Sequence, residues 1–122
     1  MYWKDLEVWK MAHELVIKIY HSTANFPNIE RYALSDQLKR AAYSIPANIV
    51  EGHSRKSSKE FVQYLYQARG SLEELRYFLF LSKDLGYLTQ EDYDKLEDES
   101  LTVSKMLNGL ISSVKQKINI KH

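Results

Sequence analysis

The sequence of 122 residues contains no cysteine. This absence excludes disulfide bonds, thiolate metal sites and cysteine nucleophiles. Long apolar runs are also missing, since no stretch approaches the roughly 20 residues that a membrane-spanning helix needs. The first ten residues, MYWKDLEVWK, lack the apolar core of a signal peptide. We therefore expect a cytoplasmic protein that does not contact a membrane.

Glycine and proline are scarce, with four and two residues respectively. No segment keeps the alternation of apolar and polar residues that marks a β-strand, so the sequence favours an all-α fold. One of the two prolines, Pro46, falls inside a segment that is otherwise typical of a helix. A proline there removes a backbone hydrogen bond and clashes with the preceding turn, at a cost of roughly 3 kcal/mol. We therefore predict that the second helix is kinked at Pro46.

The apolar spacing divides the chain into four helical segments. We place them at about residues 5–24, 34–51, 58–85 and 90–118, all within a single domain that spans residues 1–122. Long helices joined by short turns must fold back on one another. This connectivity predicts an up-down-up-down antiparallel four-helix bundle.

Short motifs mark the ends of these helices. Ser57 and Thr89 are suitable N-caps, and Ser57 is followed three residues later by a glutamate, as in a capping box. Gly52 is a suitable left-handed residue at a helix C-terminus, and Gly86 ends the third segment. Gly70 falls within a helix, where glycine costs about 1 kcal/mol relative to alanine, so we interpret it as a packing glycine.

One apolar stripe on each segment repeats at three- and four-residue spacing, as expected for the side of a helix that faces a core. The four stripes are Trp9, Ala12, Val16, Ile19 and Thr23; Leu38, Ala41, Ala42, Ile45 and Ile49; Phe61, Leu65, Ala68, Leu72, Leu75, Leu79 and Ser82; and Tyr93, Leu96, Ser100, Val103, Leu107, Leu110 and Val114.

A second set of apolar residues lies outside these stripes. Large exposed apolar surfaces usually mark contacts with other proteins, and tyrosine suits an interface because its ring is amphipathic. We therefore predict a homo-oligomer; the alternative is a wide core stripe with a few scattered exposed aromatic residues. The candidate interface residues are Val8, Met11, Leu15, Tyr64, Tyr66, Tyr77, Phe78 and Phe80.

The sequence lacks the motifs that carry metal or enzymatic chemistry. Di-metal sites in helical bundles use Glu-x-x-His motifs, and none is present. The four histidines form no convincing ligand pair, the four glycines stand apart instead of forming a phosphate-binding loop, and no Gly-x-Ser-x-Gly motif occurs. We therefore expect no metal, no cofactor, no small-molecule substrate and no enzymatic activity.

Basic side chains form the remaining candidate site. The six candidates for contacts with nucleic-acid phosphates are Lys39, Arg40, Arg55, Lys56, Lys59 and Arg69. Asp36, Glu51 and Glu60 interrupt this set, so local ion pairs on an ordinary solvated surface are the alternative. The last helix has six acids between residues 91 and 99, and four lysines but no acid from residue 101 onward. We attribute this order to the helix macrodipole, which it complements.

Three stretches of the chain are similar to a known family: DLEVWKMAHELVIKIY, FPNIERYALSDQLKRAAYSIPANIVEGHSRKS and EFVQYLYQARGSLEELRYFLFLSKDLGYL. Through them the chain resembles the four-helix bundle proteins of the 23S rRNA intervening-sequence family, from about Asp5 to Leu88. The most specific part of the resemblance is LKRAAYSIPANIVEG together with the downstream GSLEEL.

The resemblance implies a bacterial four-helix bundle protein that assembles into a ring-like homopentamer. The family is named after reading frames inside insertions of large-subunit ribosomal RNA genes. Similar relatives that accompany diversity-generating retroelements bind nucleic acid and a reverse transcriptase, and they are strongly basic, whereas this chain has a net charge of +1. We therefore expect an oligomeric adaptor that associates with RNA or a nucleic-acid-handling protein. The alternative is a protein-interaction scaffold that binds no nucleic acid.

Overall fold

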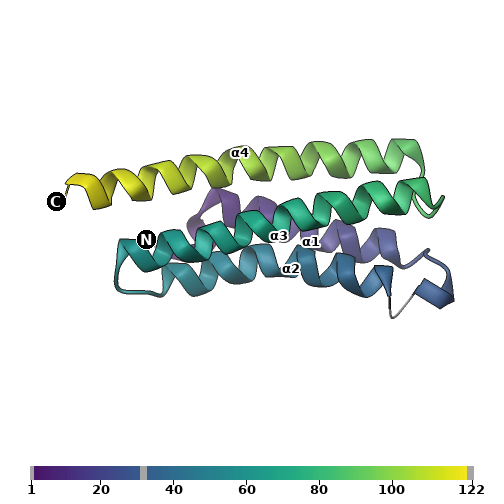
Figure 1. The fold of residues 1–122 in the computed structure, drawn as a ribbon, viewed down its shortest axis with the longest axis horizontal. Coiled ribbons are helices and arrows are strands. Elements are labelled where there is room, and N and C mark those ends of the chain that lie inside the picture. Colours follow the sequence, from purple (N-terminus) through teal and green to yellow (C-terminus); the bar gives the residue numbers. More distant parts are fainter. Residues whose placement is uncertain (1, 31–32, 121–122) are drawn as a thin grey trace.

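The computed structural model describes residues 2–30 and 33–120. Its α-helices are α1 (Glu7–Thr23), α2 (Leu34–His53), α3 (Ser58–Asp84) and α4 (Gln90–Ile120). Two short 3₁₀ helices precede α1 and α2, namely η1 (Trp3–Asp5) and η2 (Asn28–Glu30). No strand occurs in this part of the chain, so the predicted all-α fold of four packed helices is confirmed (Figure 1).

Each helix packs against two others, because α1 and α3 both contact α2 and α4. Contacts between neighbouring helices pair early residues of one helix with late residues of the other. Neighbours therefore run in opposite directions, as the colours of Figure 1 show. The side-chain pairs that define this register are Lys39 with Tyr20, Ser44 with Ser71, Arg76 with Glu97 and Lys18 with Glu99.

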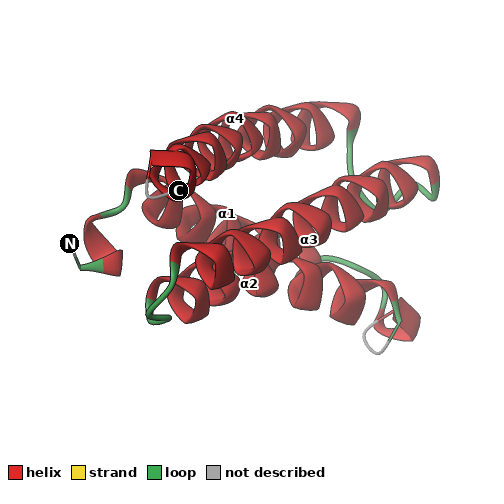
Figure 2. Cartoon of the chain, turned by 60° about the vertical axis from the view of Figure 1, so that its left-hand side comes forward, coloured by secondary structure: helices red, strands yellow, loops and turns green. Residues whose placement is uncertain are grey.

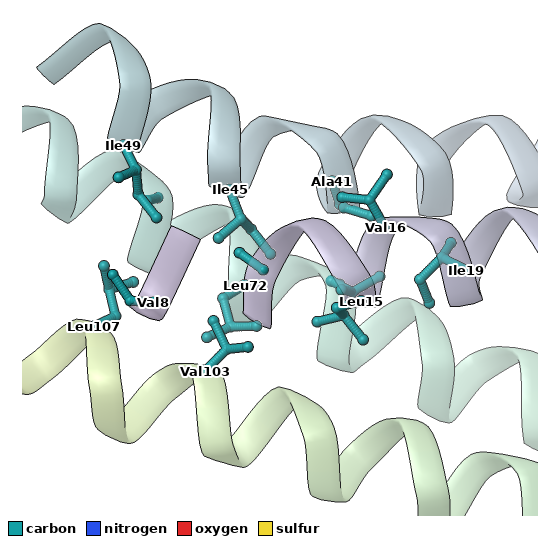
Figure 3. Close-up of a cluster of buried hydrophobic side chains, with 14 of the residues drawn as sticks. Val8, Leu15, Val16, Ile19, Ala41, Ile45, Ile49, Leu72, Val103 and Leu107 are labelled. Carbon is teal, nitrogen blue, oxygen red and sulfur yellow. The ribbon is translucent and has the colours of Figure 1, made fainter. Parts of the chain in front are cut away.

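The core lies between the four helices and is filled mainly by aliphatic side chains (Figure 3). Leu72 of α3 is fully buried there, close to Ile45 of α2 and Val103 of α4. Complete burial of an aliphatic side chain of this size contributes about 1.5 to 3 kcal/mol. All five residues of the stripe predicted for residues 34–51 are buried, so the helical spacing identified this side of α2 correctly.

The buried side of α1 is wider than the sequence pattern predicted. Val8 and Leu15, which we assigned to the oligomer interface, are only 5% and 1% exposed in the single chain. We correct that assignment: both residues belong to the core. The reason is that α1 contacts α2 on one side and α4 on the other, so its apolar arc must cover two neighbours. Trp9, placed on the core stripe, is half-buried at the edge of this arc.

Side-chain caps and one glycine define the helix ends, as predicted. The Ser57 hydroxyl accepts a hydrogen bond from the backbone N–H of Glu60 at 3.1 Å, and Thr89 Oγ1 accepts one from the N–H of Asp92 at 3.0 Å. These bonds satisfy donors that the first turn of a helix leaves without a backbone partner. Gly86 follows α3 with a φ of 81°, a left-handed conformation that glycine adopts without strain.

Pro46 lies inside α2, which is continuous through this position, and its side chain is buried. Because proline has no N–H, it cannot donate to the carbonyl of Ala42. In the following turn, the Asn48 amide donates to the Ser44 carbonyl at 2.8 Å, and Ser44 Oγ lies 2.9 Å from Ser71 Oγ on α3. The second of these contacts attaches the proline-containing turn to α3. The kink at Pro46 stays a prediction.

Gly52 has a different role from the predicted one. It lies within α2, and among the described glycines only Gly86 has a positive φ, so Gly52 is not a left-handed terminal residue. A Cβ added to Gly52 would lie 2.6 Å from Tyr64 Cβ and 2.9 Å from Cδ1 of Phe61. The absence of a side chain therefore allows the end of α2 to approach the start of α3.

Gly70 is exposed on α3, and a Cβ there would meet no heavy atom within 4 Å. The packing role predicted for Gly70 is thus wrong for the single chain. Gly52 is the glycine that permits close packing, because the α2 backbone at its position lies against Tyr64 and Phe61 of α3.

We expect Gly52→Ala to lower the free energy of unfolding by about 1 to 3 kcal/mol, because the new methyl group overlaps Tyr64 and forces α2 and α3 apart. Gly70→Ala is the matched control. It should raise the free energy of unfolding by about 1 kcal/mol, because alanine favours a helix and meets no neighbour at this position. Urea denaturation followed by circular dichroism measures both values, and equal effects of the two substitutions would contradict the assignment.

Candidate nucleic-acid interface

The six basic residues predicted to contact nucleic acid do not form one cluster. Lys39 and Arg40 lie in the second turn of α2, whereas Arg55 and Lys56 lie in the connection that follows α2. The 16 residues from Lys39 to Arg55 correspond to about 24 Å along a helix. The structure therefore divides the set between the two ends of the bundle, with Arg69 in the middle of α3.

Lys39 and Arg40 are engaged within the chain. The Lys39 ammonium lies 5.2 Å from the centre of the Tyr20 ring on α1, where the negative face of the ring attracts a cation. A guanidinium nitrogen of Arg40 lies 3.8 Å from a carboxylate oxygen of Asp36, one turn earlier on α2. Lys39 thus covers an aromatic side chain, and Arg40 forms an exposed ion pair.

Arg69 connects α3 to α4. Its guanidinium lies 4.9 Å from the centre of the Tyr66 ring and donates a hydrogen bond to Oδ1 of Asn108 at 3.2 Å. The Lys83 ammonium lies 4.4 Å from the centre of the Phe80 ring on α3 and 4.9 Å from that of Tyr93 on α4. Both cations therefore contact aromatic rings and connect the two helices.

Arg76 forms the ion pairs that fix α3 against α4. Its guanidinium donates to Glu73 at 3.0 Å and to Oε1 of Glu97 at 2.7 Å. The hydrogen bonds to Glu97 raise the pKa of Arg76 above its usual value. The other oxygen of Glu97 is buried and has no hydrogen-bond partner in the described part of the chain. Burial, with the nearby charge of Glu97, raises the pKa of Tyr93.

Lysines from α3 and α4 reach the same end of the bundle. The hydrogen bond between Arg69 and Asn108 fixes the register of the two helices. Lys59 is ten residues before Arg69 and Lys117 is nine residues after Asn108, which are rises of about 15 and 14 Å along antiparallel axes. Figure 2 shows the α2–α3 connection, the end of α4 and the N-terminal region together at this end.

We define the basic end by Arg55, Lys56, Lys59, Lys115 and Lys117. None of its four lysines forms an ion pair with another described residue. Arg55 donates to Glu51 and to the Tyr64 hydroxyl, and its guanidinium lies 4.9 Å from the centre of the Tyr64 ring. Tyr64 first and Glu51 next raise the pKa of Arg55, which keeps its positive charge. The lysines are thus free to contact phosphates.

The opposite end of the bundle is acidic. The six acids between residues 91 and 99 lie in the first turns of α4, beside the end of α3. Charge is therefore separated along the bundle, although the net charge is only +1. Lys115 and Lys117 were not among the residues predicted from the sequence, because the charge order within α4 alone is explained by the helix macrodipole. The antiparallel connectivity of the predicted bundle was the signal that could have placed them beside Lys59.

Six of the predicted interface residues lie outside the core. Met11 and Phe78 are half-buried, Tyr64, Tyr66 and Phe80 each contact a basic side chain, and Tyr77 is 60% exposed. The structure adds exposed apolar residues that the sequence analysis did not select: Ile17, Tyr20, Ile29, Tyr43 and Leu85. Ile29 is 85% exposed, so apolar surface is available outside the predicted set.

The surface hollows carry no uniform charge. One, of about 350 Å³, lies between α1 and α4 and contains Lys18 and Lys95 as well as Asp92 and Glu99. Another, of about 300 Å³, lies beside the connection between α1 and α2. Across residues 2–30 and 33–120, no three histidine or acidic side chains are grouped to hold a metal ion. No helix of these residues combines the length and apolar character needed to cross a membrane.

The model of the 23S rRNA-intervening sequence protein family matches residues 4–109. This match runs from η1 to the second half of α4. The chain belongs to this family. The resemblance found in the sequence is therefore confirmed, and the family match ends at Gly109, before the two α4 lysines of the basic end.

A solved structure is similar to this family member over most of its length. It is the crystal structure of a protein of unknown function from the S23 ribosomal protein family of Bacteroides thetaiotaomicron. The TM-score is 0.77 at 28% identity, and the match covers 85% of this chain and 97% of the Bacteroides chain. No match was found among curated proteins. The fold and the family are thus shown.

We expect Arg76→Ala to lower the free energy of unfolding by about 2 kcal/mol, because it leaves the half-buried Glu97 carboxylate without its cation. Arg40→Ala is the control, since it removes an exposed ion pair and should cost less than about 0.5 kcal/mol. Thermal and urea unfolding measure both. If Arg76→Ala lowers the free energy of unfolding no more than the control does, Arg76 does not hold α3 against α4.

Proposed function

We propose that this family member is a non-enzymatic, oligomeric adaptor that associates with RNA through the basic end, in the cytoplasm. The observation that carries the proposal is the convergence of four lysines without ion pairs to described residues at one end of the bundle, one from the α2–α3 connection and three from α3 and α4. Backbone phosphates dominate the affinity of proteins for nucleic acids, and lysine and arginine supply the contacts. The family name, which refers to 23S rRNA, supports RNA as the polyanion.

The separation of charge along the bundle supports binding at one end only. The acidic start of α4 repels phosphates, whereas the basic end attracts them. Exposed charges are screened beyond about 8 Å at physiological salt, so each end acts nearly independently of the other. A protein with a net charge of +1 can therefore present a locally cationic surface.

Self-association is the second part of the proposal, and exposed apolar side chains support it. Ile17, Tyr20 and Tyr43 form what we call the Tyr20 surface, on α1 and α2. Tyr77, Phe80 and Leu85 form the Tyr77 surface, on α3 and the residue after it. Each of these six side chains is more than 40% exposed.

The two apolar surfaces face different directions, because α1 and α3 each contact α2 and α4 and occupy opposite corners of the bundle. Two different surfaces that bind each other from copy to copy generate a ring when the rotation closes. The Tyr20 and Tyr77 surfaces therefore support the homo-oligomer, for which the family resemblance implies five subunits. The same exposed residues favour the second candidate function, a protein-interaction scaffold that binds no nucleic acid.

For the RNA contact, we expect the affinity for a structured RNA hairpin to fall by about 100-fold between about 50 and 200 mM salt, because binding by a few lysines releases counterions. The double variant Lys56→Gln/Lys59→Gln should bind more weakly, and the slope of log affinity against log salt should decrease by about 1.8, since each lysine contributes about 0.9 on a mostly double-stranded RNA. Fluorescence anisotropy of labelled hairpin measures both quantities.

The control for this experiment is Lys18→Gln/Lys95→Gln, which removes the same charge near the acidic end. It should leave affinity and salt slope unchanged. Absence of binding at low salt would refute the RNA contact and leave the scaffold as the better function. Equal losses in both double variants would show that net charge, and not the basic end, controls binding.

For self-association, we expect Ile17→Asp and Tyr77→Asp each to convert the oligomer into a monomer, because each places a charge in one half of the contact between copies. An equimolar mixture of the two variants retains one intact pair of surfaces and should form a dimer only. Light scattering after size-exclusion chromatography gives the masses. A monomeric wild type, or dissociation by just one of the substitutions, would contradict the ring.

A further inference from the structure

Four aromatic rings form a row at the N-terminal end of the chain. The ring centres of Tyr2 and Trp3 are 5.2 Å apart, those of Trp3 and Trp9 4.8 Å, and those of Trp9 and His13 5.1 Å. The Trp9 and His13 rings are stacked, with 4° between their planes. We call Tyr2, Trp3, Trp9 and His13 the aromatic row. None of these four residues belongs to the buried core, to the Tyr20 surface or to the Tyr77 surface.

The aromatic row belongs to the same end of the molecule as the lysines. The helix η1, which carries Trp3, contacts both α1 and α2. Because α1 and α2 run in opposite directions, the start of α1 lies beside the end of α2, as Val8 and Ile49 show in Figure 3. The connection that contains Arg55 and Lys56 follows directly. Figure 2 shows the N-terminus and the α2–α3 connection at this end.

The four rings of the row differ in exposure, since Trp3 and Trp9 are half-buried whereas Tyr2 and His13 are exposed. Trp9 packs against the core, which holds the row in place. Tyr2 is 52% exposed and His13 is also exposed, so the outer members present ring surface to solvent. Such surface is available for stacking by a flat ligand, and Tyr2 and His13 lie at the two ends of the row.

A cation lies near the rings of Tyr2 and Trp3. The Lys4 ammonium lies 5.7 Å from the centre of the Tyr2 ring and 5.5 Å from that of the Trp3 ring. An aromatic face next to an ammonium group matches the two parts of a nucleotide, because the base stacks on the ring and the phosphate pairs with the cation. The α2–α3 connection, which carries Lys56, and the end of α4 lie at the same end of the bundle as the N-terminus (Figure 2).

We propose that the aromatic row stacks with unpaired bases, so that the basic end prefers single-stranded RNA over duplex RNA of equal charge. This inference rests on the proposed association with RNA. In a duplex the base faces are covered by neighbouring bases, and only the backbone and the groove edges are accessible. Lysines contact both forms through phosphates, whereas the rings of Tyr2 and Trp3 can contribute only where a base is free to stack.

The chain offers an intrinsic probe, because both of its tryptophans are in the row. Tryptophan fluorescence is recorded while an unstructured RNA of about 12 nucleotides, or a hairpin of the same length, is added to the full chain. The single strand should quench the fluorescence and bind about tenfold more tightly than the hairpin. Heparin, a polyanion without bases, should bind without quenching.

Two exposed side chains provide a pair of variants. Tyr2→Ala should weaken binding of the single strand by about tenfold and leave binding of heparin and of the hairpin unchanged. Ile29→Ala removes an exposed apolar side chain that belongs to neither the basic end nor the two surfaces proposed for self-association, and it should change none of these affinities. Tyr2→Phe keeps the ring and should restore the wild-type preference.

The outcomes separate this inference from the function on which it rests. Equal affinity for single strand and hairpin without quenching would overturn the stacking role while the basic end still binds RNA. Loss of heparin binding in Tyr2→Ala would show a general structural effect and overturn it too. Fluorescence that changes with protein concentration in the absence of RNA would assign the row to a contact between copies. No binding of any polyanion would overturn both proposals.

Discussion

The antiparallel register of α3 and α4 determines where the charges of this protein lie. Two contacts fix that register: Arg76 with Glu97, and Arg69 with Asn108. Because of it, the acids at the start of α4 lie beside the end of α3, and the lysines at the end of α4 reach the level of Lys59. A parallel or shifted arrangement of the same two helices would place acids beside these lysines and remove the basic end.

Cations on aromatic rings recur over the surface and have a common physical effect. Lys39 covers Tyr20, Arg69 covers Tyr66 and Arg55 contacts Tyr64. Each pair shields part of an exposed ring from water while the cation keeps its charge. Lys56, Lys59, Lys115 and Lys117 have no such partner among the described residues and lie together at one end, and Lys105 in the middle of α4 also has none. This distribution explains how a nearly neutral chain can present a locally basic surface.

The proposed association with RNA and the proposed association between copies use different parts of the molecule. The lysines lie at one end of the bundle, whereas the Tyr20 and Tyr77 surfaces lie on its sides. A ring with its bundles side by side would repeat the basic end on one face, and repeated weak sites gain affinity through high effective concentration. The two proposals are thus compatible in one assembly.

The sequence by itself determined the four helices, the caps at Ser57 and Thr89 and most of the buried stripes, because these depend on spacing and contacts within a few residues. It misplaced Val8 and Leu15, assigned close packing to Gly70 instead of Gly52, and grouped Lys39 with Arg55. Only the tertiary structure decided those positions, because each depends on which helix lies alongside and at what register. The basic end is the clearest case: its lysines come from segments more than fifty residues apart and meet only when α3 and α4 pack.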